Sequence, residues 1–493
     1  MNLLTSTRDT EVSIDYTNAI IKGLAENGGL FVPKRFNKID FSNPKFLNME
    51  YKDYVIEVLS SFIDNIDYDD LKKIVNISYD DKFDTNEIAP LKKINEKFIV
   101  ELYHGPTLAF KDMALSILPN LLKFSKEKNN INEKTVILTA TSGDTGKAAL
   151  EGFANVENLD IIVFFPMNGV SPIQKRQMLT QKGENTHVFG IDGNFDDAQS
   201  AVKKILNDID FKKHLKENNY SFSSANSINI GRLLPQIVYY ISSYFKLVKL
   251  SEIKYSDKID VIVPTGNFGN ILAAKYAKNL GLPIDKLICA SNENNILTDF
   301  INTGIYDLNR EFIKTMSPSM DILISSNLER LLFHLADNDA KKVNKLMNNL
   351  KDDGMYEIDK KMKNNLNDFK SYYCNEANTK ETIKNVFEKN NYLIDPHTAV
   401  AFNVCEKYKN ENTDSNKVLI VSTASPYKFP ISVAKSLDIY ENIDDYKLLR
   451  KISLYTNTKI PKNIISIEND KIIHNKNILI DEMKKNILDS LNI

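Results

Sequence analysis

TVILTATSGDTG (residues 135–146) decides the fold class. Its first five residues are apolar or β-branched and predict a buried strand, and its glycines predict a turn that opens a helix from about residue 146. The alternation recurs, with strands expected at 98–100, 160–166, 260–264 and 417–423 and a helix at 270–280. Short runs rich in valine and isoleucine between helices predict an α/β fold with largely parallel sheets covered on both faces.

The chain of 493 residues is long enough for about two to four domains. We expect a mostly helical N-terminal segment at 1–95, two open, largely parallel-sheet domains at 96–250 and 251–440, and a tail at 441–493. A polar region near 300–390 is richest in Lys, Asn and Asp at 337–384. It predicts helices with a solvated face or a mobile insertion.

The composition is that of an ordinary globular protein, with 42% hydrophobic and 26% charged residues and a formal net charge of −2. This net charge is too small to indicate a nucleic-acid or membrane partner. The start of the chain has no apolar stretch typical of a signal peptide. The three cysteines and six histidines show no metal-ligand spacing, so we expect no metal and reduced thiols in the cytoplasm.

HGPTLAFKD (104–112) places Lys111 among Leu108, Ala109, Phe110, Met113 and Ala114. Desolvation is costly for an ammonium, so a lysine in such surroundings tends to lose its proton and become a nucleophile. That amine could bond an aldehyde cofactor such as pyridoxal phosphate. The alternative is a lysine with a buried stem and a solvated head.

Two glycine-containing loops each follow a strand and precede a helix, where unpaired N–H groups suit an anion. The first, at 139–146, adds the hydroxyls of Ser142 and Thr145 and suits a carboxylate. The alternative is a helix capped by Asp144 or Thr145. A nucleotide P-loop is rejected because its pattern needs a glycine at position 141 and Ser or Thr at 148.

The second loop, PTGNFGN (264–270), lets Gly266 and Gly269 bring the backbone close to a ligand, and phosphate suits its N–H groups. It lacks the dinucleotide fingerprint, and an ordinary turn is the alternative. In SANSINIGR (224–232), the polar groups of Asn226, Ser227 and Asn229 precede Arg232, whose planar fork matches phosphate. The alternative there is a helix cap with a surface arginine.

A fourth segment, STASPYKF (422–429), ends a strand, where open α/β sheets bind ligands. Thr423 could hydrogen-bond a ring nitrogen there, and a plain strand exit is the alternative. HGPTLAFKD, TATSGDTG, NSINIGRL, PTGNFGN, DPHTAVA (395–401) and STASPYKF together resemble the threonine synthase family, pyridoxal-phosphate enzymes of the tryptophan-synthase-β superfamily. STR…GLAENGGLFVP (6–33) resembles the family's N-terminal signature. The resemblance covers about residues 1–440 and departs at Ser425, where the family commonly has histidine.

The resemblance implies the tryptophan-synthase-β-like fold and a role for each matching residue. Lys111 would carry pyridoxal 5′-phosphate, the loop of Gly266, Asn267, Phe268, Gly269 and Asn270 would hold its phosphate, and Thr423 would contact its ring nitrogen. Ser142, Asp144 and Thr145 would lie where the family holds the substrate carboxylate. Asn226, Ser227 and Arg232 would lie where it holds the substrate phosphate.

The implied reaction converts O-phospho-L-homoserine and water to L-threonine and phosphate, catalysed by a monomer or homodimer. A phospholyase of the same superfamily, which releases phosphate, ammonia and 2-oxobutyrate, would use the same loops. A β-eliminating dehydratase would not need the groups around Arg232. A binding protein without cofactor on the same fold is disfavoured because Lys111 and both glycine loops are present.

Overall fold

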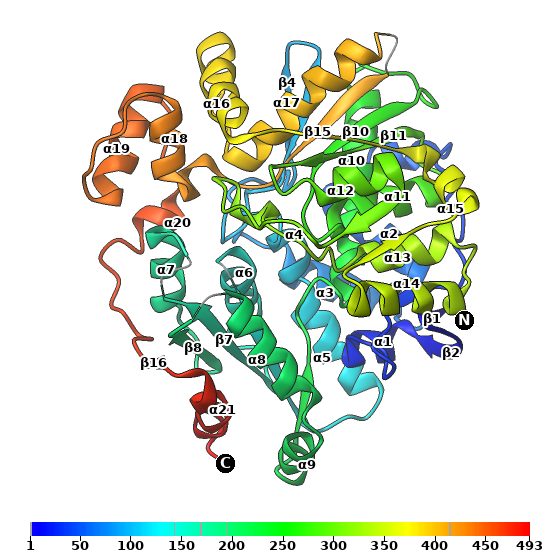
Figure 1. The fold of residues 1–493 in the computed structure, drawn as a ribbon, viewed down its shortest axis with the longest axis vertical. Helices are drawn as coiled ribbons and strands as arrows, with labels where there is room; N and C mark the ends of the chain where they lie inside the picture. The colour runs from blue at the N-terminus through cyan, green and yellow to red at the C-terminus, as the bar shows by residue number, and fades with distance from the viewer. Residues whose placement is uncertain (1, 142, 168–169, 194, 414–415) are drawn as a thin grey trace.

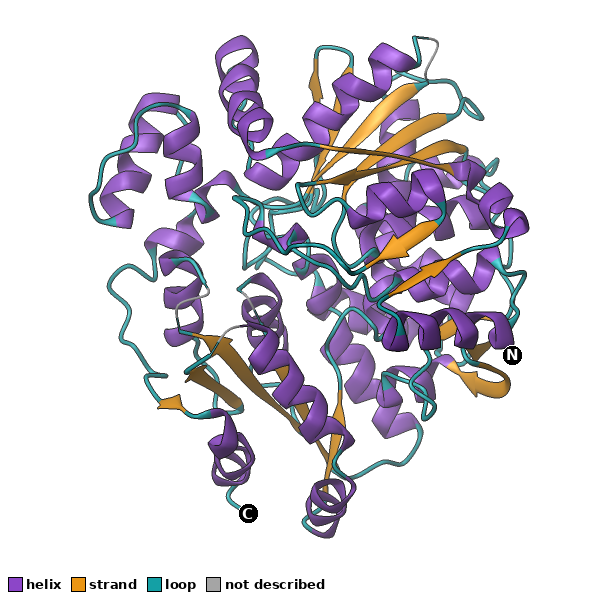
Figure 2. Cartoon of the chain, viewed as in Figure 1, coloured by secondary structure: helices purple, strands orange, loops and turns teal. Residues whose placement is uncertain are grey.

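The computed structural model describes residues 2–493 except 142, 168–169, 194 and 414–415. It has two parallel-sheet α/β units: β10, β11 and β15 lie at the upper right of Figure 1, and β7 and β8 lie at the lower left. Helices cover both sheets (Figure 2). The predicted fold class, with largely parallel sheets and helices in the N-terminal segment, is confirmed.

The larger sheet has six strands in the order β14-β11-β10-β15-β5-β4. Their bounds are β14 Phe369–Tyr373, β11 Ile284–Ser291, β10 Ile259–Pro264, β15 Lys417–Ser422, β5 Lys97–Glu101 and β4 Leu91–Ile94. Neighbouring strands are parallel except for the β4–β5 hairpin. The strands expected near 98–100, 260–264 and 417–423 are present within a residue or two, whereas β11 and β14 were not anticipated.

Both faces of the larger sheet are buried, which explains the continuous apolar runs of its strands. Val261 and Val263 of β10 belong to a core that includes residues of α10 (Ile230–Lys249) and α11 (Gly269–Leu280). Ile262, between them, points to the other face and joins residues of α17 (Pro396–Glu411) in a second core. The alternation follows from the two-residue period of a strand.

The smaller sheet is entirely parallel, in the order β16-β8-β7-β6-β9. Its strands are β16 Asn477–Ile478, β8 Thr186–Ile191, β7 Leu159–Pro166, β6 Lys134–Ala140 and β9 Tyr220–Ser223. Val163 of β7 packs in the same core as α6 (Asp144–Phe153), and Ile162 packs in the core of α8 (Phe195–Asn207). This sheet therefore presents the start of α6 at the carboxyl end of β6.

The remaining helices surround these sheets and support the N-terminal segment. They include α1 Tyr16–Lys22, α2 Tyr51–Phe62, α3 Tyr68–Ser78, α4 Asp112–Leu115, α5 Leu118–Lys128, α7 Pro172–Leu179, α13 Leu328–Leu335, α14 Ala340–Asp352, α16 Glu376–Asn390, α18 Pro430–Ser436, α19 Asp445–Thr456, α20 Lys462–Ile465 and α21 Met483–Leu491. The N-terminal segment also carries an antiparallel sheet of β1 Leu3–Ser6, β2 Asp9–Asp15 and β3 Phe31–Pro33.

The division into four segments stays a prediction, but strand pairing crosses all three of its boundaries. The β4–β5 hairpin spans residue 95, and β5 pairs with β15 across the boundary at residue 250. In Figure 1 the tail, in red, runs along the left edge from α20 to α21, and its β16 pairs with β8 of the smaller sheet. The 337–384 region has the expected half-solvated helices α14 and α16, but it also supplies the edge strand β14.

Gly152 is required where α6 crosses α4, because a Cβ there would lie 2.0 Å from the carbonyl oxygen of Leu115. In an open helix, Gly→Ala would gain about 0.5–1 kcal/mol. Here the clash decides the sign, and we expect Gly152→Ala to lower the free energy of unfolding by about 1–3 kcal/mol. Denaturant titration measures it. Gly269→Ala, whose Cβ would meet nothing within 3.4 Å, is the control. A Gly152→Ala protein as stable as the parent would contradict the packing described.

Candidate active site

The segment before Lys111 is joined to the end of β15. Ala109 and Ala424 form an antiparallel bridge, in which the Phe110 N–H donates to the Thr423 carbonyl at 2.8 Å. The Ser425 N–H donates to the Leu108 carbonyl at 3.1 Å. These bonds bring two segments predicted to act together, HGPTLAFKD and STASPYKF, side by side at the carboxyl edge of the larger sheet.

Lys111 immediately precedes α4, and its side chain is only 13% exposed. Burial lowers the pKa of Lys111 to about 8; the carboxylate of Asp144 opposes this shift, and the charges of Arg232 and Lys428 add to it. The Nζ atom lies 4.0 Å from Oδ2 of Asp144. A large neutral fraction near pH 8 is what a nucleophilic amine requires. Desolvation of the amine speaks against the alternative of a buried stem with a solvated head, and the catalytic role of Lys111 stays a prediction.

Asp144 is the centre of a buried polar cluster. Its Oδ1 lies 2.5 Å from Nζ of Lys428 and accepts a hydrogen bond of 2.8 Å from Nε2 of Gln174, while Ser319 Oγ donates to Oδ2 at 3.2 Å. Burial would raise the pKa of Asp144, but the charges of Lys428 and then Lys111 outweigh it and hold that pKa far below its usual range. Asp144 is therefore a fixed carboxylate beside the Lys111 amine.

The first glycine loop is held by its own threonine. Thr141 Oγ1 accepts hydrogen bonds from the N–H groups of Gly143 at 3.0 Å and Gly146 at 2.9 Å. The N-cap of α6 is Gly143, so the alternative that Asp144 or Thr145 caps the helix is wrong. The N–H groups of Asp144 and Thr145 belong to the first turn of α6. N–H groups in a first turn have no carbonyl partner within their helix. Ser142 lies outside the described residues.

The second glycine loop turns sharply from β10 into α11. Phe268 has φ +62° and ψ 0°, a left-handed conformation that is uncommon outside glycine and marks functional turns. Its ring is buried and packs against Phe369, with 5.8 Å between centroids. A Cβ at position 266 would lie 2.6 Å from the Ser319 carbonyl oxygen, so Gly266 is required by the fold itself.

Asn270, in the first turn of α11, carries an unused donor. The hydroxyls of Tyr239 and Tyr240 both donate to its Oδ1 at 2.5 Å. Its Nδ2 is buried and has no hydrogen-bond partner among the described residues. A buried polar group without a partner is costly, so such a group indicates a missing acceptor. Phosphate oxygen beside the helix start satisfies that requirement.

The third segment presents Arg232 to the interior. Asn229 caps α10, accepting from the Gly231 N–H at 2.9 Å, as the helix-cap alternative expected. The surface-arginine part of that alternative is wrong, because Arg232 is 4% exposed and burial lowers its pKa to about 10. One of its terminal nitrogens donates to the Ala225 carbonyl at 3.0 Å, while its buried Nε has no partner among the described residues. Arg232 thus offers a second unused donor for an anion.

Asn226 and Ser227, also assigned to an anion, are half-buried in this segment. Ser227 Oγ lies 3.3 Å from Ser326 Oγ, which donates to Oδ1 of Asn267 at 3.2 Å. The structure therefore brings together the second and third predicted loops. Sequence reasoning missed Lys428, Gln174, Ser319 and the 325–330 segment as parts of this site, since only the fold brings them there.

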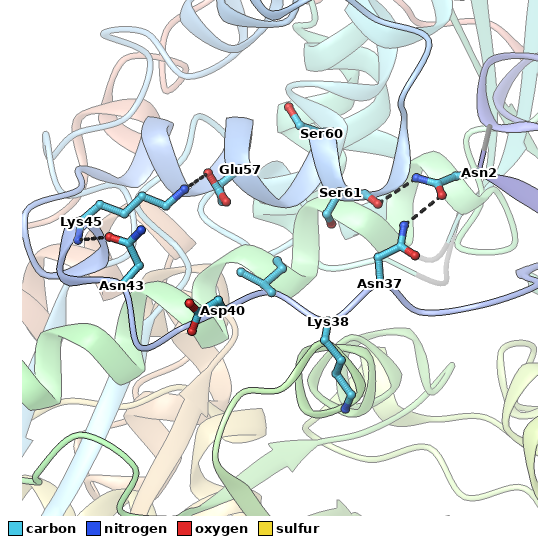
Figure 3. Close-up of a pocket in the computed structure, with 10 residues that line it drawn as sticks. Asn2, Asn37, Lys38, Asp40, Asn43, Lys45, Glu57, Ser60 and Ser61 are labelled. Atoms are coloured by element: carbon cyan, nitrogen blue, oxygen red, sulfur yellow. Dashed lines mark hydrogen bonds and ion pairs between the residues drawn. The ribbon is translucent and has the colours of Figure 1, made fainter.

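A pocket of about 350 Å³ lies elsewhere, against the N-terminal segment (Figure 3). Its lining is polar and includes the Lys45–Glu57 ion pair, and it contains none of the predicted site residues. Among the described residues, no cluster of three or more His, Cys, Asp or Glu side chains could hold a metal ion. No helix in the described part of the chain is both long and apolar enough to cross a bilayer.

Two family models match the chain. One, described as the threonine synthase N terminus, matches residues 4–79, and another, pyridoxal-phosphate dependent enzyme, matches residues 86–424. Threonine synthase from Saccharomyces cerevisiae is 35% identical over 96% of both chains. The structure of pyridoxal-phosphate-bound threonine synthase from Brucella melitensis superimposes with a TM-score of 0.88, 33% identity and 99% coverage of both chains.

Human threonine synthase-like 1 is 41% identical over 439 residues, which are 86% of this chain but 58% of the human protein. The chain therefore spans less than two thirds of that relative. The chain belongs to the threonine synthase family of pyridoxal-phosphate-dependent enzymes.

The residues present fit pyridoxal phosphate. The Lys111 amine has a lowered pKa, and the orphaned Nδ2 of Asn270 lies at the start of α11 with the glycine loop. Thr423, buried at the end of β15, is joined through its carbonyl to the residue before Lys111. Arg232 and Lys428 place two buried cations near the carboxylates of Asp144 and Asp112, and a guanidinium with an unused donor favours a phosphorylated guest.

Gly269 provides the cleanest test of the cofactor-phosphate loop. A Cβ there would meet only Asn327 and Gln236 atoms at 3.5–4.0 Å, so the fold tolerates a small side chain. Gly269→Val places bulk beside the helix start, and we expect cofactor affinity to fall by about tenfold or more with little loss of stability. Cofactor fluorescence measures the dissociation constant. Gly269→Ala, with a smaller side chain, should weaken cofactor binding less than Gly269→Val does. An unchanged dissociation constant would mean that the loop is only a turn.

His104, at the start of the Lys111 segment, predicts a pH-dependent stability. Its Nδ1 lies 2.6 Å from Asp84 and its Nε2 lies 3.0 Å from Glu101. Burial would lower the pKa of His104, but the bonds to Asp84 and Glu101 outweigh it and raise the pKa to about 9. Because the folded pKa exceeds the unfolded value of 6.5, the stabilisation is complete below pH 6.5 and is lost as pH rises through about 9.

The measurement compares urea unfolding of the parent and His104→Gln between pH 6 and 10. The difference between them should shrink across the window from 6.5 to about 9. Lys111 titrates in both proteins, so its contribution cancels. A difference that stays constant with pH would show that His104 is neutral in the folded protein.

Proposed function

We propose that the protein is a threonine synthase, which converts O-phospho-L-homoserine and water to L-threonine and phosphate. The observation that supports this proposal most directly is the buried Arg232. Its Nε has no hydrogen-bond partner among the described residues, and its charge adds to the burial that lowers the pKa of Lys111. An enzyme that used an unphosphorylated amino acid would need only one phosphate site, the cofactor-phosphate loop that contains Asn270. A second buried cation beside the amine supports a substrate that brings its own phosphate.

Each predicted site residue has a place in this proposal. Lys111 holds the cofactor, the loop from Gly266 to Asn270 holds its phosphate through N–H groups and the Asn270 amide, and Thr423 bonds its ring nitrogen. Asp144 is engaged by Lys428, so its side chain does not bind an anion. The substrate carboxylate is assigned to the N–H groups of Asp144 and Thr145 with the Ser142 hydroxyl. The substrate phosphate is assigned to Asn226, Ser227 and Arg232.

When bound, pyridoxal phosphate supplies an electron sink for negative charge beside the substrate amino group. Lys111, with a pKa of about 8, is suited both to take and to return a proton near neutral pH. It takes the proton from Cα and then moves a proton at Cβ. The Asp144 carboxylate, 4.0 Å away, stabilises the ammonium that forms.

The atoms balance across the reaction. The Cγ–O bond breaks, and its electron pair leaves with phosphate, whose charge Arg232 stabilises. Hydroxide from water adds to Cβ. Of the three protons released from Cα, Cβ and water, one returns to Cα, one is added to Cγ to complete the methyl group, and one leaves with phosphate. Groups that hold the phosphate in place while the bond breaks contribute through orientation as well as charge.

The substrate is thus a small phosphorylated amino acid, and we keep the cytoplasm as the proposed location. The three cysteines support this location, because all are buried and free, as expected in a reducing compartment. The deciding experiment incubates the holoenzyme with O-phospho-L-homoserine and measures phosphate, threonine and 2-oxobutyrate. Equal release of phosphate and threonine supports the proposal. Phosphate with 2-oxobutyrate and ammonia would assign the phospholyase reaction instead.

Arg232→Leu tests the substrate-phosphate assignment. Losing a charge-assisted contact should weaken use of the phosphorylated substrate by about 2–5 kcal/mol, while an unphosphorylated amino acid still binds through its carboxylate. Binding of matched ligands with and without the γ-phosphate is followed by cofactor absorbance. Arg176→Leu is the control, because that guanidinium also bonds backbone carbonyls but lies on α7 beside the tail. If Arg232→Leu keeps the parent's preference for phosphorylated ligands, Arg232 does not bind the phosphate.

A further inference from the structure

Residues 325–330, at the start of α13, lie against the cofactor-phosphate loop. Ser325 Oγ donates to the Gly266 carbonyl at 2.7 Å. Asn327 donates twice to the Asn267 carbonyl, from its backbone N–H and its Nδ2, at 3.0 Å each. Three bonds therefore fix the carbonyls of the loop and leave its N–H groups to point toward other partners.

The same segment reaches the substrate-phosphate loop through Arg330. One terminal nitrogen of Arg330 donates to the Ile228 carbonyl at 2.5 Å, within the segment that carries Asn226, Ser227 and Arg232. The other terminal nitrogen donates to Oδ1 of Asn327, the residue that binds the cofactor-phosphate loop. Its Nε donates to the Phe31 carbonyl of β3 at 2.9 Å. One planar guanidinium thus connects both loops and the N-terminal segment.

Arg330 is fully buried, at 0% exposure, and burial lowers its pKa to about 10. The charge of Glu329 opposes this shift, but among the described residues that carboxylate is ion-paired with Arg8 and not with Arg330. The adjacent Glu329 is engaged elsewhere: it accepts from Thr7 Oγ1 at 2.5 Å and from Arg8 at 2.9 and 3.0 Å. A buried cation is retained at a cost, and carbonyl oxygens alone satisfy its hydrogen bonds without neutralising its charge.

We propose that Arg330 is a positioning residue that sets the separation of the cofactor-phosphate and substrate-phosphate loops, and that its buried charge favours anions in both. The identity of the second anion as a substrate phosphate rests on the proposed function; the coupling of two anion-binding loops does not. Lysine cannot replace it, because a single ammonium on a flexible stem cannot hold three acceptors in one plane.

The test uses purified holoenzyme of the parent, Arg330→Lys and Arg310→Lys. The control, Arg310, also bonds a backbone carbonyl and a carboxylate but lies away from both loops. Cofactor dissociation is followed by fluorescence, inorganic phosphate binding by calorimetry, and thermal stability by scanning calorimetry. The binding measurements are made at a temperature well below the melting temperature of each variant. We expect Arg330→Lys to weaken cofactor binding and phosphate binding by roughly tenfold each, while Arg310→Lys leaves both unchanged.

Affinities within about twofold of the parent, with a lowered melting temperature, would overturn the proposal and leave Arg330 a core residue. Asn327→Ala is the second variant, informative even if Arg330→Lys does not fold. It removes the Nδ2 bond to the cofactor-phosphate loop and the Oδ1 acceptor of Arg330, but keeps the backbone N–H bond to the loop and the Arg330 bond to the Ile228 carbonyl. Cofactor retention should therefore fall while phosphate binding stays near the parent's. Equal losses in both, or in neither, would also contradict the proposal.

These binding measurements need no turnover of O-phospho-L-homoserine. If the parent forms no threonine but the variants lose both affinities as expected, the proposed function fails and the role of Arg330 stands. If the parent forms threonine and the variants bind cofactor and phosphate like the parent, the proposed function stands and the role of Arg330 fails.

Discussion

The buried ion pair between Asp144 and Lys428 is the interaction on which the site depends. Asp144 begins α6 of the smaller-sheet unit, and Lys428 follows β15 of the larger sheet, so the pair joins the two units at the middle of the site. Lys428 also donates to the Thr107 carbonyl at 2.8 Å, within the segment that leads to Lys111. Removing either partner would leave an uncompensated buried charge, which is strongly destabilising. The same carboxylate keeps the Lys111 amine from becoming too weak a base, so structural and chemical requirements meet in one residue.

The electrostatics of the site follow from this arrangement. Lys111, Lys428 and Arg232 lie near two carboxylates, Asp144 and Asp112, and the starts of α6 and α11 add the positive ends of two helices. The buried Nδ2 of Asn270 and Nε of Arg232 have no hydrogen-bond partner among the described residues, as is expected of donors reserved for an anion. Such preorganised donors act strongly because they need not reorient when charge develops. Residues 325–330 hydrogen-bond both the cofactor-phosphate and the substrate-phosphate loops.

Local pattern predicted more of the fold than of the site. Strands β6, β7, β10 and β15 were predicted because buried parallel strands are continuous apolar runs. β9 and β14 were not, because YSFS and FKSYY carry too few apolar residues to stand out. Lys111 was predicted because its apolar neighbours are adjacent in sequence. Gln174, Ser319 and Arg330 were not, since their partners lie 30 or more residues away and no short pattern records them. The carboxylate of Asp144 was assigned to an anion site because its partner Lys428 is visible only in the folded chain.

The most direct test of this account is to identify the lysine that holds the cofactor. Borohydride treatment of the holoenzyme fixes pyridoxal phosphate permanently to that amine, and peptide mass spectrometry locates it. The lowered pKa and the position of Lys111 beside Asp144, Thr423 and the glycine loops predict labelling at Lys111 alone. Lys428 and Lys147 are also buried, but both are already engaged with carboxylates. Labelling of either, with Lys111 unmodified, would contradict the account.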